Sequence, residues 1–444
     1  MKLTVPALDI KADEGFSPDK DIFNRKEFGE SLLNMIKNAN DELVIALDAP
    51  WGEGKTTFVK MWRGYLANNN IKSIYFDAFK NDYQKDPFFA VSSQIYQLIE
   101  PQDEKEKNEY KKRAVSALKT IGRAGLRIGI KALTSGVLDE TVFEDTGTVK
   151  DVSQETSKII DGYISKRIES ANQDRENLSC FRIYIEALAK KLGKGSPIIF
   201  IVDELDRCKP NFALELLESI KHLFSVKNIV FVLVMNREQL EESVRSEYGV
   251  GIDSSKYLQK FVSLWANLSK SKNQYDNSIN KYLHNCLDRM EFETKTGNQQ
   301  QCIGNYEELA NYYNLSLREI EKSLTNFSII CNTTSENMAT DYQWLSVYLA
   351  IVKVIYPNTY NKIANATIAY DELINETNIV NLSDDYWKDK SEPHFLRWLL
   401  RYYLSENEEL TEFLKQGDFS GNRFGRRDGG IETVCKLLEI YKVT

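Results

Sequence analysis

Four short apolar runs stand out along the chain: Leu43–Leu47, Ile71–Phe76, Ile198–Val202 and Ile229–Val234. Each run is nearly continuous rather than alternating, as strands are when helices cover both faces of a parallel sheet. Helical patterns lie between them. One of these begins near Pro210, a residue suited to a first helical turn, and its apolar positions recur at helical spacing: Phe212, Ala213, Leu216, Leu217, Ile220 and Leu223. The alternation predicts an α/β domain with a parallel sheet.

The distance between the second and third runs is too long for a single crossover. It holds a charge run, an unusual helical stretch at Ala117–Leu138 and a polar segment, which together indicate a helical insertion. After about Ser269 the strand signal fades and amphipathic helices follow, at Tyr306–Tyr313, Leu317–Ile330, Trp344–Tyr356 and His394–Leu404. We therefore expect four parts: residues 1–100 and 181–270 as the two halves of the α/β core, 101–180 as the insertion, and 271–444 as a helical domain.

The composition is that of a folded protein, with 42% hydrophobic and 27% charged residues in 444. A net charge of −8 gives no general attraction to nucleic acid, and the one compact basic-aromatic patch, at Arg423–Arg427, is typical of a solvated loop. Six scattered cysteines and three histidines offer no zinc spacing and predict free thiols in the cytoplasm. No window reaches the roughly 20 apolar residues that span a bilayer.

The segment Ala49-Pro50-Trp51-Gly52-Glu53-Gly54-Lys55-Thr56-Thr57 follows the first strand and opens a helix. It fits the P-loop pattern, except that Ala49 replaces the first glycine. Glycines at 52 and 54 let the backbone curl so that N–H groups point at phosphate oxygens, and the helix start adds its positive dipole end. Lys55 would reach the β- and γ-phosphates of a nucleoside triphosphate, and the Thr56 hydroxyl would bind Mg²⁺.

Polar residues also follow two later strands. Asp203 and Glu204 end the run Ile198–Val202, at the edge where open α/β sheets bind ligands. We expect Asp203 to hold Mg²⁺ through its water shell and Glu204 to polarise the attacking water. Asn236 follows the run Ile229–Val234, and it can orient that water if its strand lies between the other two. The alternative is a polar residue that merely ends a strand, as asparagine often does.

These motifs, in chain order, resemble those of the KAP family of P-loop NTPases, a branch of the additional-strand, catalytic-glutamate class. The matching segments are Asp21-Ile22-Phe23-Asn24-Arg25 with Phe28, Trp51-Gly52-Glu53-Gly54-Lys55-Thr56, Val202-Asp203-Glu204-Leu205-Asp206-Arg207-Cys208, Tyr257-Leu258-Gln259-Lys260-Phe261-Val262 and Leu317-Arg318-Glu319-Ile320. The D-E-L-D-R-C stretch is the most specific. The resemblance adds Phe23 to the expected nucleotide-binding residues.

The resemblance implies a parallel sheet of order 5-1-4-3-2, ATP as the nucleotide, and a part in bacterial signalling or phage exclusion. Many relatives carry transmembrane helices in the insertion, whereas this insertion contains none. Two functions stay open: an ATPase whose cycle drives conformational change or assembly with protein partners, and an ATP-gated scaffold or peripheral membrane organiser with little turnover. Glu204 favours the ATPase, because a pure switch does not need a well-placed carboxylate.

Two arginines are candidates for the same site. Arg207 either pairs with a nearby acid such as Asp206 or faces a neighbouring subunit's nucleotide, and buried arginines are usually paired. Ser316 and Glu319 form a capping box that places Arg318 in the first turn of a helix. A cation gains nothing from the dipole there, so Arg318 either senses an external anion, the γ-phosphate, or is a solvated surface charge.

The insertion carries a row of cations, Lys119, Arg123, Arg127 and Lys131, spaced every four residues. On a helix they form one stripe whose charges repel one another, and three nearby glycines weaken the helix further. Such a helix needs support from outside itself. Packing within the same molecule is one source, and contact of residues 117–138 with a partner or with anionic lipid at the inner membrane is the other.

Overall fold

A computed structural model of the chain describes residues 2–39, 41–84, 86–124, 154–268, 278–292, 297–333, 340–382, 395–405 and 430–440; side chains at 121–124, 154–172 and 297–299 are not described. Its core is a five-stranded sheet of order β2-β3-β4-β1-β5 in which all neighbours run parallel. The strands are β1 (Leu43–Asp48), β2 (Ser73–Asp77), β3 (Ile198–Asp203), β4 (Ile229–Met235) and β5 (Leu264–Asn267).

The expected strand order is confirmed, and the four apolar runs correspond to β1, β2, β3 and β4. β5 was not among those runs. It has four residues, none of them fully buried, and Leu264 is 38% exposed. A short edge strand of this kind lacks the continuous apolar run by which a doubly covered strand is recognised.

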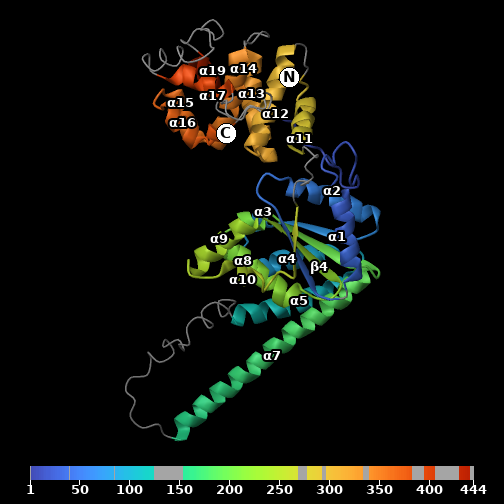
Figure 1. Cartoon of the computed structure of the whole chain (residues 1–444). Coiled ribbons are helices and arrows are strands. Elements are labelled where there is room, and N and C mark those ends of the chain that lie inside the picture. Colours follow the sequence, from blue (N-terminus) through green and yellow to red (C-terminus); the bar gives the residue numbers. More distant parts are fainter. Residues whose placement is uncertain are drawn as a thin grey trace.

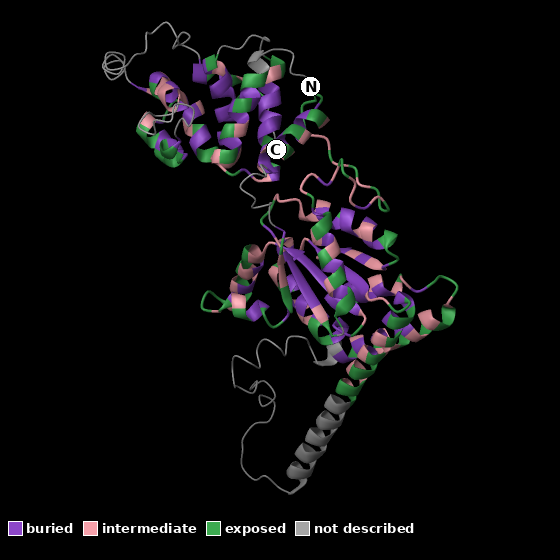
Figure 2. Cartoon of the chain, turned by 45° about the vertical axis from the view of Figure 1, so that its right-hand side comes forward, coloured by how far each residue is buried: buried purple, intermediate pink, exposed green. Residues whose placement is uncertain are grey.

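Helices cover both faces of the sheet, and the inner strands β1, β3 and β4 are largely buried (Figure 2). On one face, α1 (Lys26–Asn38) and α2 (Lys55–Asn68) pack against the side chains of Ile45, Ile201 and Val232. The other face is covered by α4 (Pro87–Tyr96), α7 (Gln154–Gly193), α8 (Pro210–Ser219) and α9 (Arg237–Tyr248), with the short helices α3 (Ala78–Asn81) and α10 (Ser254–Leu258) beside them.

The insertion shares the core of the sheet domain. Helix α5 (Glu104–Ala124) contributes Tyr110 and Ala117, and the C-terminal half of α7 contributes Phe181 and Ile185, to one apolar cluster. Helix α7 also runs across the boundary expected at residue 180, because its last turns cover the sheet. No helix in the described ranges is long and apolar enough to cross a membrane.

The cationic stripe lies mostly outside the described residues, since Arg127, Lys131 and the side chain of Arg123 are not described. The described start of the stretch packs within the molecule. Ala117 is fully buried, Thr120 accepts a hydrogen bond from the Asn177 amide at 3.3 Å, and Lys119 is exposed. Contact of the remaining stretch with lipid or a partner stays a prediction.

The C-terminal part forms a helical domain above the sheet domain in the view of Figure 1, with a separate apolar core. Its helices are α11 (Ser278–Arg289), α12 (Gly297–Tyr312), α13 (Leu317–Thr333), α14 (Thr340–Ile355), α15 (Pro357–Ala364), α16 (Tyr370–Glu376), α17 (Phe395–Leu404) and α19 (Gly430–Ile440). The central helix is α14, which is buried from Trp344 to Val352.

The N-terminal segment contacts both domains. The backbone N–H of Lys2 donates to the carbonyl of Met290 at 2.7 Å, and the Ser328 hydroxyl donates to the carbonyl of Leu3 at 2.7 Å. Further along, Gly15 packs against Gly64 in α2. The segment therefore leaves the helical domain and reaches the helix that follows the first strand.

The contact between Gly15 and Gly64 gives a prediction about stability. A Cβ at Gly64 would lie 2.4 Å from the backbone nitrogen of Gly15. Overpacking of this kind costs about 1–3 kcal/mol, which exceeds the roughly 0.8–1.0 kcal/mol that alanine gains over glycine in a helix. We expect Gly64→Ala to lower the free energy of unfolding, measured in urea.

Gly304 is the matched control, because it also lies in a helix and a Cβ there would meet no described atom within 4 Å. Gly304→Ala is expected to raise the stability by up to about 1 kcal/mol. Equal stabilisation by both substitutions would contradict the packing assigned to Gly15.

Candidate functional site

The loop between β1 and α2 has the backbone of a phosphate cradle. Gly52 and Gly54 have φ values of +85° and +75°, in the left-handed region that glycine adopts without strain. The Lys55 ammonium donates to the carbonyls of Ala49 at 2.6 Å and Pro50 at 3.1 Å. Burial lowers the pKa of Lys55, while the nearby carboxylates of Asp206 and Glu204 oppose the shift. A partly buried cation at the start of α2 is suited to an anionic ligand.

Two carboxyl groups face this loop from the end of β3. Asp203 is 1% exposed, accepts hydrogen bonds from the Tyr75 hydroxyl at 3.0 Å and the Glu204 N–H at 2.9 Å, and contacts the Thr56 hydroxyl. Burial raises the pKa of Asp203, and those hydrogen bonds work against it. The Thr56 hydroxyl also lies 3.5 Å from Glu204 Oε1. The predicted partners therefore come together.

Glu204 has a strained backbone, with φ of +62° in a region that non-glycine residues rarely adopt. Burial raises the pKa of its carboxyl, the Arg207 charge lowers it, and Asp203 raises it further. Strain of this kind persists only where the surrounding structure enforces it, and it clusters at functional sites.

Arg207 is paired, as expected, but with a different acid. Its Nε lies 2.6 Å from Glu204 Oε2, whereas Asp206 accepts a hydrogen bond from the Trp51 indole N–H. The left-handed residue Glu204 and the 3₁₀ turn Leu205–Arg207 return the arginine to the glutamate three positions earlier. The expectation that Arg207 pairs with a nearby acid is confirmed, and that acid is Glu204, not Asp206, which was given as an example.

Arg25 holds the loop through hydrogen bonds to two of its backbone carbonyls. Its guanidinium donates to the carbonyl of Glu53 at 3.0 Å and that of Gly54 at 3.4 Å, and it lies 4.7 Å from the Phe23 ring centroid. The side chain is 5% exposed, and burial lowers its pKa to about 10, against the favourable charges of Glu53 and Asp21. Glu53 thus holds Arg25 through its backbone carbonyl, and its negative charge favours the charged form of that arginine.

The helical domain reaches the loop through the first turn of α13. The capping box is present: Ser316 N–H donates to Glu319 Oε2 at 2.7 Å, and Glu319 N–H donates to Ser316 Oγ at 3.3 Å. A Cβ at Gly52 would lie 3.0 Å from Arg318 Cβ, so this glycine permits the close approach of α13. Arg318 is thereby placed in the first helical turn, beside the P-loop.

These elements surround a cavity of about 320 Å³. Its described lining includes seven cations and three carboxylates, so positive charge is in excess by four: Lys20, Arg25, Lys55, Lys60, Arg207, Arg289 and Arg318 against Asp21, Glu204 and Glu321. A nucleoside triphosphate carries a comparable negative charge. The cavity thus matches such a ligand in charge, and its volume lies at the small end of the range for ligand pockets.

Most predicted site residues line this cavity, namely Phe23, Trp51, Gly52, Gly54, Lys55, Thr56, Thr57, Glu204 and Arg318. Asp203 is not among the lining residues, but it accepts a hydrogen bond from the Glu204 N–H and contacts the Thr56 hydroxyl. Asn236 follows the strand between β1 and β3, as expected, but it is not among the lining residues, and its side chain caps α9 by accepting from the Glu238 N–H at 3.1 Å. The Asn236 side chain is thus a helix cap in this structure, and its role in orienting water stays a prediction.

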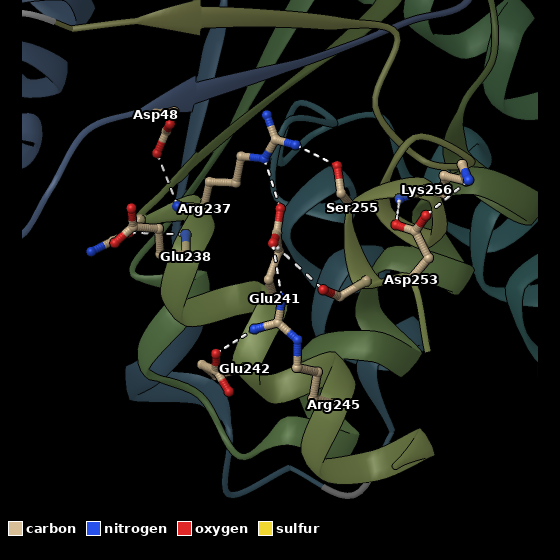
Figure 3. A network of polar contacts seen from close by, with 11 residues as sticks. Asp48, Arg237, Glu238, Glu241, Glu242, Arg245, Asp253, Ser255 and Lys256 are labelled. Atoms are coloured by element: carbon tan, nitrogen blue, oxygen red, sulfur yellow. Dashed lines mark hydrogen bonds and ion pairs between the residues drawn. The ribbon is translucent and has the colours of Figure 1, made fainter. Parts of the chain in front are cut away.

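The residue after Asn236 belongs to a polar network that fixes this strand end (Figure 3). The Arg237 N–H donates to Asp48 Oδ1 at 2.9 Å, and its guanidinium donates to Glu241 at 2.8 Å and to Ser255 at 2.5 Å. The network joins the end of β1 to the end of β4. The P-loop follows β1, and the acidic pair lies at the end of β3, the neighbour of β4.

The lining residues that were not predicted as site residues include Lys60, Tyr282, Arg289 and Glu321. Lys60 is one turn beyond the P-loop motif. The other three belong to α11 and α13, and no local motif marks them, because only packing between the domains brings them to the cavity.

The residues fit a magnesium ion. Thr56 supplies a hydroxyl beside two carboxyl groups whose pKa values burial has raised, so a divalent cation would offset the cost of their charge. Within the described ranges no group of three or more His, Cys, Asp or Glu side chains could hold a metal by itself. Phosphate oxygens and water would have to complete the shell, as Mg²⁺ prefers.

Comparison with known proteins agrees with the motifs. Residues 25–334 match the model of the KAP family P-loop domain. No curated protein matches the chain. Among solved structures, it is similar to the Aeropyrum pernix ORC2 protein, in a structure of ADPNP–ADP complexes, at 14% identity over 96% of this chain and 97% of that one. The TM-score is 0.36, too low for conclusions about this chain. The family match covers well over half of the sequence, so the chain belongs to the KAP family of P-loop NTPases.

Proposed function

We propose that the protein binds Mg-ATP and hydrolyses it, and that hydrolysis changes how the helical domain sits on the sheet domain. The observation that carries this proposal is the position of Glu204, which lies against Thr56 and lines the cavity. A carboxylate with a raised pKa is suited to accept a proton at neutral pH.

The roles follow from the contacts. Lys55 and the loop N–H groups bind the phosphates, and Thr56 and Asp203 hold Mg²⁺, which neutralises phosphate charge when bound. Glu204 takes a proton from a water molecule as the water oxygen attacks the γ-phosphorus. The bond between the γ-phosphorus and the β–γ bridging oxygen breaks, which gives ADP and phosphate. Trp51, Thr57 and Phe23 line the same cavity and position the nucleotide.

Phosphate release from ATP by the purified full chain tests this function. We expect turnover that requires Mg²⁺ and disappears with EDTA. A chain that binds ATP but releases no phosphate over many hours, at several protein concentrations, would rule out the ATPase.

A second function is favoured by one contact. Arg207 holds Glu204 Oε2 at 2.6 Å, which keeps one carboxylate oxygen from a water molecule. If that pair persists with nucleotide bound, the protein acts as an ATP-gated scaffold with little turnover. Arg207→Ala separates the two functions, because it would raise phosphate release from a scaffold and would not raise it in a competent ATPase.

The contact between α13 and the P-loop predicts that Arg318 senses the γ-phosphate. Arg318→Ala removes a cation beside Gly52 and should weaken ATP binding by about tenfold, the size of one charge-assisted hydrogen bond, while ADP binding changes little. Equilibrium titration with both nucleotides measures the difference. Equal losses for ATP and ADP would assign Arg318 a structural role.

The proposed setting is a bacterial anti-phage defence or signalling system, with the protein in the cytoplasm or peripheral to the inner membrane. The support for this setting is the family resemblance. The proposed output is assembly or contact with a protein partner, for which the helical domain offers the nucleotide-dependent surface.

A further inference from the structure

Three residues of the helical domain line the cavity and have no role assigned to them in phosphate binding. Tyr282 and Arg289 belong to α11, and Glu321 lies one turn beyond Arg318 in α13. The Tyr282 hydroxyl donates to Glu321 Oε1 at 2.5 Å, and an Arg289 Nη lies 3.6 Å from the same oxygen. We call these residues the Tyr282 cluster.

The Tyr282 cluster holds unused hydrogen-bonding capacity. The Arg289 Nε is buried without a hydrogen-bond partner, and the closest acceptor of its Nη2 is the Cys286 sulfur at 3.5 Å. The ion pair with Glu321, at 3.6 Å, is longer than a hydrogen bond and leaves the Nε of this arginine, whose side chain is 17% exposed, without an acceptor. An acceptor supplied by a ligand would satisfy it.

The lining of the cavity also contains apolar and aromatic side chains. The Tyr282 ring stacks on Phe23 with centroids 5.9 Å apart and planes at 27°, and Ala7, Leu8, Ile22 and Met61 complete the lining. Charged phosphate groups gain no favourable contact from such an apolar surface. A planar nucleobase gains favourable contact there, because every base can stack on aromatic side chains.

We propose that the Tyr282 cluster recognises the nucleoside part of the nucleotide, the base and ribose, while the P-loop holds the triphosphate. Glu321 accepts hydrogen bonds from nucleoside hydroxyl or amino groups, Arg289 donates to acceptors, and the base lies against the Phe23 and Tyr282 rings. This inference rests on the proposed nucleotide function and adds that the helical domain, not the P-loop, distinguishes a nucleotide from a bare polyphosphate.

The test compares two probes that share the phosphates and differ in the nucleoside: Mg-ATP and Mg-tripolyphosphate, each titrated calorimetrically into the full chain. Arg289→Gln and Glu321→Gln are expected to weaken ATP binding by about tenfold each and to leave tripolyphosphate binding within about twofold. Asp288→Asn and Lys322→Gln, at exposed neighbouring positions outside the lining, should change neither.

Equal weakening of both probes by the cluster variants, or no weakening of ATP, would overturn the inference. Tyr282→Phe removes only the hydroxyl and keeps the test open if a charge substitution unfolds the domain. Lys55→Ala should weaken both probes. Wild-type protein that binds ATP and tripolyphosphate equally well would keep the P-loop function and refute nucleoside recognition, whereas binding of neither would refute both.

Discussion

Lys55→Ala is expected to weaken Mg-ATP binding by about a hundredfold or more. The Lys55 ammonium lies at the start of α2 inside the loop, where it is already partly desolvated. Its loss removes charge-assisted hydrogen bonds worth about 1.5–3 kcal/mol each, and 2.8 kcal/mol is about a hundredfold in affinity. Calorimetric titration of the purified variant measures the change.

The control is Lys37→Ala, which removes an exposed lysine from the last turn of α1, away from the cavity. It should bind ATP like the wild type. Unfolding curves for both variants separate lost binding from lost structure. An unchanged affinity in Lys55→Ala would show that the loop does not hold the phosphates.

Glu204→Gln is expected to bind ATP normally and to release phosphate about a hundredfold more slowly or worse. The amide keeps the shape of the carboxylate but cannot accept the proton, and general base catalysis contributes 10²–10⁴-fold in typical enzymes. Single-turnover phosphate release, measured with enzyme in excess over ATP, isolates the chemical step from product release.

Asp206→Asn is the comparison, because Asp206 lies two residues away and holds the Trp51 indole. The amide oxygen can still accept that hydrogen bond, so the rate should change little. Normal hydrolysis by Glu204→Gln together with loss of hydrolysis in Asp206→Asn would assign the general base to Asp206 instead.

Contiguous motifs were the part of the molecule that the sequence could predict. β1, β3 and β4 are continuous apolar runs, and the P-loop residues Gly52–Thr56 act through local backbone conformation. The capping box at Ser316 and Glu319 is equally local. In the P-loop and the capping box the interacting atoms are a few residues apart, so spacing alone determines the local geometry.

Long-range packing could not be predicted in the same way. Tyr282 meets Phe23 across more than 250 positions of sequence, and Arg25 reaches the carbonyls of Glu53 and Gly54 from a preceding segment. Arg207 pairs with Glu204 because a left-handed residue turns the chain back, and no propensity predicts a positive φ at a glutamate. These contacts depend on how separately encoded elements pack.

The N-terminal segment gives the two domains a second connection, which is held at both ends by non-covalent contacts. Leu3 is hydrogen-bonded to α13 of the helical domain, Gly15 is packed on α2, and Ala7 and Leu8 between them line the cavity. Twelve residues span at most about 40 Å when fully extended. While both ends stay attached, the segment limits the separation of the domains at these two points to that length. Proteolytic cleavage within the segment would allow a larger domain movement without removing any side chain from the P-loop.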